Sequence, residues 1–171
     1  MLSEQMLKKL NDQINAELYS AYMYQSMSAW AADQDLKGLA NWMDCQAQEE
    51  VAHARMIYGY VQERGGRVLL AAIDGPPTEW DDAVAVAENV LEHEQKVTGL
   101  INDLVDQAIE EKDHATRSFL NWFVDEQVEE EDSANDLVAT LRLASQSPGG
   151  MLMIDRELAA RTYTPPAPEE D

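Results

Sequence analysis

The chain has 171 residues with few glycines and prolines, a size and composition that fit one domain built from long helices. Its 12 basic and 33 acidic residues give a net charge of −21, which makes nucleic acid and anionic membranes poor partners. The same charge makes cations plausible partners, although a highly solvated, salt-adapted surface would explain it as well. A single cysteine, no signal-peptide core and no apolar run of about 18 residues lead us to expect a soluble cytoplasmic protein.

Apolar residues at spacings of three and four predict four long helices in the first part of the chain. They cover about residues 3–32, 36–64, 80–111 and 116–144. The breaks after the first and third helices are short, so the helices that they join should be antiparallel. The second break, GGRVLLAAIDGPPTE, is long enough when extended to run the length of a helix. We therefore expect an all-α four-helix bundle, up-down-down-up, with one long crossover.

The remainder of the chain predicts two further segments. Residues 151–161, MLMIDRELAAR, have the composition of a short fifth helix. Residues 164–171, TPPAPEED, form an acidic, proline-rich tail with no means of packing, and we expect it to be disordered. Residues 1–163 would then form a single domain.

Each predicted long helix has polar residues in the middle of its core-facing apolar stripe. In the first helix, for example, Glu17 is in phase with Ile14 and Ala21. The polar residues on the four stripes include Glu17, then Glu50 and His53 with Gln46 one turn before them, then Glu94, and finally Gln127 and Glu130. The same spacing separates Glu17 from Glu50 and Glu94 from Gln127. The two helical hairpins therefore carry equivalent sets of polar groups.

Carboxylates that converge in a bundle core repel one another and lose their hydration, at a cost of several kcal/mol per ion. Protonation could neutralise the carboxylates. Ion pairing could not, because the stripes contain no lysine or arginine. Two divalent metal ions would balance four carboxylates, and oxygen ligands with one imidazole suit iron or manganese. Di-iron bundles commonly place Glu-x-x-His on two helices; this chain has Glu50-x-x-His53 on one and Gln127-x-x-Glu130 on the other. The alternative is a hydrogen-bonded polar layer without metal.

With these residues in place, the sequence resembles the bacterial non-haem ferritins over nearly its whole length. The matching stretches are ELYSAYMYQSMSAW (17–30), AQEEVAH (47–53), HEQKVTGLIN (93–102) and FLNWFVDEQVEEE (119–131). The resemblance implies a ferritin-like bundle that assembles into a homo-oligomeric shell of 24 subunits. It also implies a ferroxidase, which oxidises Fe(II) with oxygen or hydrogen peroxide and stores the product as a ferric mineral for iron storage and detoxification.

The resemblance also assigns site residues. The first iron of a di-iron centre would be bound by Glu17, Glu50 and His53. The second would be bound by Glu94, Glu130 and a bridging Glu50, with Gln127 beside it. A third iron site would use Glu49, Glu126, Glu129 and Glu130, although an ordinary solvated helix face would also explain the three that lie off the stripes. Tyr24 and Trp122 match aromatic residues close to the centre, where packing is the alternative to a redox or hydrogen-bonding role.

Related families differ from this chain at identifiable positions. Bacterioferritins carry Glu-x-x-His on both helices and a haem-ligating methionine directly after the bridging glutamate; Val51 stands there in this chain, so we expect no haem. Rubrerythrin-like peroxidases usually add a four-cysteine site, which a single cysteine cannot form. A DNA-protecting mini-ferritin would form a particle of twelve subunits. A non-catalytic interaction module would take up no iron.

Overall fold

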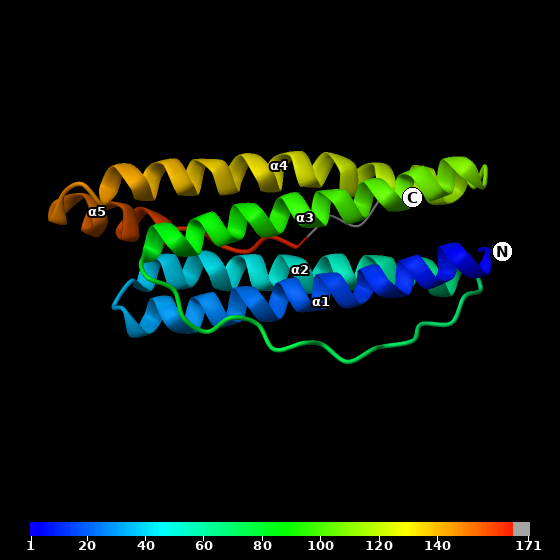
Figure 1. The fold of residues 1–171 in the computed structure, drawn as a ribbon, viewed down its shortest axis with the longest axis horizontal. Coiled ribbons are helices and arrows are strands. Elements are labelled where there is room, and N and C mark those ends of the chain that lie inside the picture. Colours follow the sequence, from blue (N-terminus) through cyan, green and yellow to red (C-terminus); the bar gives the residue numbers. More distant parts are fainter. Residues whose placement is uncertain (166–171) are drawn as a thin grey trace.

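The computed structural model describes residues 1–165, and all regular structure within them is helical (Figure 1). The four long helices are α1 (Glu4–Asp33), α2 (Lys37–Glu63), α3 (Ala83–Glu110) and α4 (His114–Ala144). A short helix, α5 (Pro148–Leu158), packs against α2 and α4 at one end of the bundle. The predicted all-α bundle with a short C-terminal helix is confirmed. None of the helices in this part of the chain is long and apolar enough to cross a membrane.

The crossover between α2 and α3 runs in extended form along α1, from one end of the bundle to the other (Figure 1). Two asparagines of α1 hold it in place. The Asn11 side chain accepts a hydrogen bond from the Leu69 amide at 2.7 Å, and Asn15 donates to the Ala72 carbonyl at 3.1 Å. Farther along, the Ser26 hydroxyl donates to the Pro77 carbonyl at 2.6 Å. Because the crossover spans the bundle, α2 and α3 run parallel, as the up-down-down-up topology requires.

The helix ends follow local capping chemistry and differ by a few residues from the predicted ranges. The third helix begins at Ala83 because the Asp82 side chain accepts a hydrogen bond from the Ala85 amide at 2.8 Å. The fifth begins at Pro148 because Ser147 caps it in the same way. Of the predicted tail, residues 166–171 lie outside the described part of the chain.

The start of α2 has no cap from its own sequence, and a residue of α5 supplies one. Asp155 Oδ1 accepts hydrogen bonds from the amides of Gly38 and Leu39, at 2.8 and 3.0 Å. The two backbones approach so closely there that a Cβ added to Gly38 would lie 1.5 Å from the Asp155 carbonyl oxygen. A glycine at position 38 is therefore what allows α5 to cap α2.

The hydrophobic core consists of two clusters, one towards each end of the bundle. The cluster near α5 includes Trp30, Leu39 and Leu141, and the cluster at the other end includes Leu10 and Leu120. The polar residues of the four stripes lie between the two clusters. The apolar ends therefore hold the helices together while the middle of the bundle remains chemically polar.

Candidate metal centre

The polar side chains predicted on the four stripes are all buried at the same level of the bundle. Their exposed fractions are 2% for Glu17 and Glu50, 3% for His53, 0% for Glu94, and 6% for Gln127 and Glu130. Helical phase explains this, since each residue lies on the core-facing stripe between the two apolar clusters. The sequence pattern therefore located a real polar layer, whose role as a metal site is considered below.

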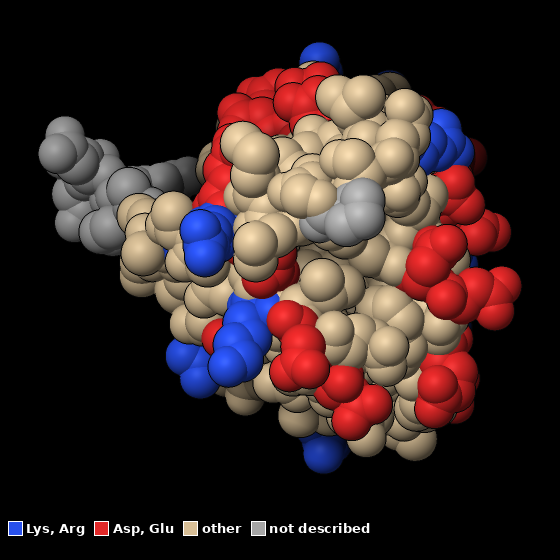
Figure 2. Space-filling view, turned by 90° about the vertical axis from the view of Figure 1, so that its left-hand side faces the viewer, with Lys and Arg blue, Asp and Glu red and all other residues tan. Residues whose placement is uncertain are grey.

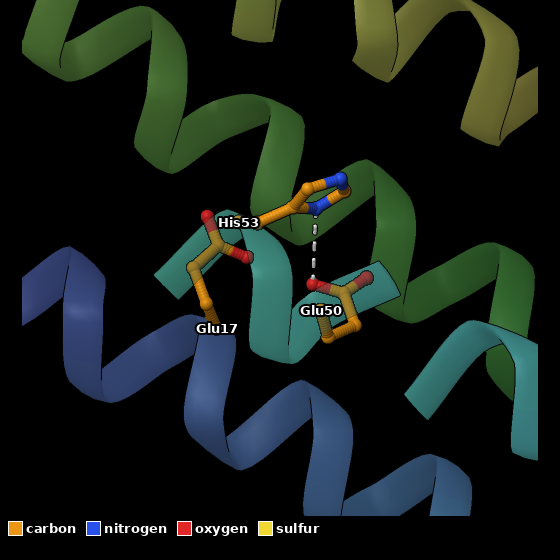
Figure 3. Close-up of side chains that lie close together, drawn as sticks. All are labelled: Glu17, Glu50 and His53. Carbon is orange, nitrogen blue, oxygen red and sulfur yellow. Dashed lines mark ion pairs between the residues drawn. The ribbon is translucent and has the colours of Figure 1, made fainter. Parts of the chain in front are cut away.

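Glu17, Glu50 and His53 come together most closely (Figure 3). Each offers a potential ligand atom within 4.8 Å of the others, and His53 Nδ1 lies 3.5 Å from Glu50 Oε2. Glu17 extends from α1, and Glu50 and His53 extend from consecutive turns of α2 (Figure 3). Glu50 Oε2 is buried and has no hydrogen-bond partner among the described residues. An unpaired buried carboxylate oxygen beside a carboxylate and an imidazole suits a divalent cation.

Three of the four carboxylates of the layer are oriented by neutral hydrogen-bond donors. The Tyr24 hydroxyl donates to Glu94 Oε1, and Gln127 Nε2 donates to Glu94 Oε2 at 3.3 Å. Gln46 Nε2 donates to Glu130 Oε2 at 2.8 Å, while Gln13 Nε2 donates to Glu17 Oε1 at 2.9 Å. Such donors fix a carboxylate without cancelling its charge, as the residues that orient metal ligands do.

Gln13 and Gln46 were not predicted as site residues. A signal for both was present in the sequence, since each glutamine lies four residues before a stripe glutamate, Glu17 or Glu50, and so shares its helix face. The amide partners of the layer could therefore have been identified by the same periodicity that identified the acids.

Burial changes the protonation of the whole layer. It raises the pKa of Glu94 to about 7, and burial together with the nearby charge of Glu94 raises the pKa of Glu130 to about 8. Burial and the neighbouring carboxylates raise the pKa of Glu50 well above its ordinary value. Burial lowers the pKa of His53 to about 4, so its imidazole is neutral at pH 7 and has a lone pair for a metal. The metal-free layer therefore retains protons that a cation would displace.

The residues predicted for a third iron site are less closely gathered. Glu126 Oε1 lies 3.8 Å from His53 Nε2, at the edge of the layer. Glu49 Oε2 instead accepts a hydrogen bond from Arg161 Nη2 at 2.7 Å, and Glu129 is exposed. Within residues 1–165, the closely spaced group of three possible ligands is Glu17, Glu50 and His53.

The two aromatic residues named from the sequence contact different members of the layer. Tyr24 is fully buried and is hydrogen bonded to Glu94. Trp122 packs edge-on against His53, with 5.4 Å between the ring centroids. Tyr24 therefore contacts a carboxylate of the layer, whereas Trp122 packs against the imidazole.

Known proteins with similar sequences and structures are ferritins. The sequence profile of the ferritin family, described as a ferritin-like domain, matches residues 7–144. A bacterial non-heme ferritin of Bacteroides fragilis is 42% identical over 161 residues, which are 94% of this chain and 100% of that protein. A probable bacterial non-heme ferritin-like protein of Haemophilus influenzae is 39% identical over 92% of this chain and 96% of its own length.

The solved structures agree. A crystal structure of an open-pore ferritin from the hyperthermophilic archaeon Archaeoglobus fulgidus superposes with a TM-score of 0.94. The two sequences are 51% identical, over 95% of this chain and 100% of the archaeal one. The sequence profile, the curated relatives and the superposition each cover most of the chain. The chain belongs to the ferritin family.

Proposed function

We propose that the protein is an iron-storage ferritin subunit and a ferroxidase, which oxidises Fe(II) to Fe(III) within its bundle and releases the product to a mineral store. The observation that carries the proposal is the buried layer of four glutamates and one neutral histidine, with an unpaired oxygen on Glu50. A layer that served only as hydrogen-bonded packing would not need so many acids whose ionisation burial opposes.

In this proposal the layer binds two Fe(II) ions as substrates. Glu17, Glu50 and His53 would hold the first, while Glu94 and Glu130, with Glu50 as a bridge, would hold the second. Gln127 would position Glu94. Val51 stands directly after Glu50, where bacterioferritins carry a haem-ligating methionine, and we therefore predict that the protein binds no haem. The cytoplasmic location is also a prediction.

The electron balance fixes what the pair of ions must do. Each Fe(II) gives up one electron, so a pair reduces one oxygen to hydrogen peroxide with two protons, or one hydrogen peroxide to two waters, also with two protons. The side chains hold the two ions close together, exclude bulk water and release protons from Glu94 and Glu130 as metal binds.

Assembly into a closed shell of 24 subunits is part of the proposal. The end of the bundle that carries α5 presents an uncharged area bordered by both acidic and basic side chains (Figure 2). Leu143, Leu152 and Met153 are 70, 56 and 73% exposed in α4 and α5. Large apolar side chains that are exposed in one subunit and close in sequence support an interface between copies.

An anaerobic titration of metal-free protein with Fe(II), followed by mixing with oxygen, tests the function. We expect about two tightly bound ions per subunit and an oxidation much faster than that of Fe(II) in buffer, followed by near-ultraviolet absorbance. Weak binding with only slow oxidation, independent of the protein, would reduce the polar layer to a structural feature of a shared fold.

Replacing Tyr24 with phenylalanine should weaken binding of the second Fe(II) about tenfold, because the Glu94 carboxylate loses a charge-assisted hydrogen bond. Burial keeps the pKa of Tyr24 well above its ordinary value, so its hydroxyl is a donor at all working pH values. Calorimetric titration measures the affinity, and Tyr22→Phe is the matched control, since Tyr22 is 50% exposed on the same helix. If binding is unchanged and only oxidation slows, Tyr24 supplies an electron instead of positioning Glu94.

A further inference from the structure

The segment that follows α5 turns back towards the middle of the bundle and lies against α2 (Figure 1). Asn41 Nδ2 donates hydrogen bonds to the carbonyls of Leu158 and Arg161, at 3.3 and 2.9 Å. The Cys45 thiol also contacts the Arg161 carbonyl, at 3.8 Å. These contacts hold the backbone of the segment, so its position does not depend on the Arg161 side chain alone.

The Arg161 side chain reaches one of the residues predicted for a third metal ion. Its Nη2 donates to Glu49 Oε2 at 2.7 Å, and its guanidinium lies 4.6 Å from the centroid of the Trp42 ring. The two charged side chains are only 26 and 20% exposed. Packing on Trp42 and pairing with Glu49 therefore fix the guanidinium in a partly buried position.

Glu49 is electrostatically coupled to the metal layer that lies beside it. Its charge contributes to raising the pKa of Glu130 and of Glu126, after burial and closer carboxylates. Burial raises the pKa of Glu49 itself, and the nearby guanidinium opposes that shift. The negative charge at this edge of the layer is thus already balanced by a cation that belongs to the chain.

We propose that the Arg161 guanidinium, a cation that belongs to the chain, pairs with the Glu49 carboxylate in the place of a third metal ion. Each subunit therefore binds two metal ions tightly and a third only weakly. The proposal rests on the proposed function, because it needs Fe(II) binding in the neighbouring layer. A third ion at Glu49 would break the ion pair and would lie close to a displaced guanidinium of like charge. Arg161 Nη1 is buried without a hydrogen-bond partner among residues 1–165, so the ion pair of Arg161 with Glu49 is made through Nη2.

The test is an anaerobic Fe(II) titration of the intact protein by calorimetry. In Arg161→Gln we expect the third ion to bind about tenfold more tightly than in the wild type, with the first two unchanged. Arg156→Gln removes the same charge from an exposed position in α5 and should behave as the wild type. Adding Glu49→Gln to Arg161→Gln should abolish the gain, because the freed carboxylate is the expected ligand.

Two results would overturn the proposal. One is a third ion that binds the wild type as tightly as it binds Arg161→Gln. The other is an equal gain in Arg161→Gln and Arg156→Gln, since that would reflect only the overall charge. Failure of the proposed function looks different, because the first two tight sites would then be missing from the wild type and from every variant.

Discussion

Replacing Glu50 with alanine is expected to slow the oxidation of Fe(II) by at least about 100-fold, the largest loss that any single substitution in the layer should cause. Glu50 lies beside Glu17 and His53, and its pKa is raised by burial and by the charges of Glu17, Glu94 and Glu130. Its carboxylate is therefore next to both proposed metal positions. Removing it should separate the two ions, and a single Fe(II) ion that ends as Fe(III) gives only one of the two electrons that reduce oxygen to hydrogen peroxide.

Stopped-flow absorbance after mixing anaerobically loaded protein with oxygen measures this rate. Glu63→Ala is the matched control, because Glu63 is an exposed acid on the same helix. Circular dichroism and sedimentation should show both variants folded and assembled, since the apolar clusters on either side of the layer are intact. Fast oxidation that persists in Glu50→Ala would place the reaction elsewhere in the protein.

The fold could be predicted because its information is local and repetitive. Apolar spacing of three and four residues defined the long helices, and the segment between the second and third was long enough to let them run parallel. The helix starts could not be placed so well. Asp82 and Ser147 each begin a helix by capping it, and the cap of α2 comes from Asp155, more than a hundred residues away. A contact across that separation leaves no trace in local periodicity.

The polar layer could be predicted for the same reason as the helices, whereas its surroundings could not. Glu17, Glu50 and Glu94 are in phase with apolar neighbours, so burial followed from the pattern. Periodicity gave no sign that Arg161 pairs with Glu49, because the segment after α5 is irregular and its path depends on contacts with Asn41 and Cys45. The resemblance to bacterial ferritins assigned Glu49 to a metal site. It gave no sign that the Arg161 guanidinium would pair with the same carboxylate.

The metal-free protein should become less stable as the pH rises from about 6.5 to 8. In the folded protein the pKa of Glu94 is about 7 and that of Glu130 about 8, both above the ordinary value of 4.5. The folded state therefore binds more protons than the unfolded state in this range, and the free energy of unfolding falls as those protons leave, by on the order of 3 kcal/mol. Below pH 6.5 the effect is partly hidden, because His53 and His93, with pKa values of about 4, act in the opposite direction.

Urea unfolding of metal-free protein at fixed subunit concentration, at pH 6.5 and 8, measures the change. The double variant Glu94→Gln and Glu130→Gln cannot lose those protons, so its stability should vary much less over this range. Two exposed acids of α3, the helix of Glu94, serve as controls: Glu92→Gln and Glu110→Gln should leave the wild-type dependence in place. An undiminished pH dependence in the double variant of Glu94 and Glu130 would mean that other groups carry the protons.

Since a metal ion competes with protons for the same oxygens, anaerobic Fe(II) should stabilise the wild type more at pH 8 than at pH 6.5, and the double variant should lose that gain.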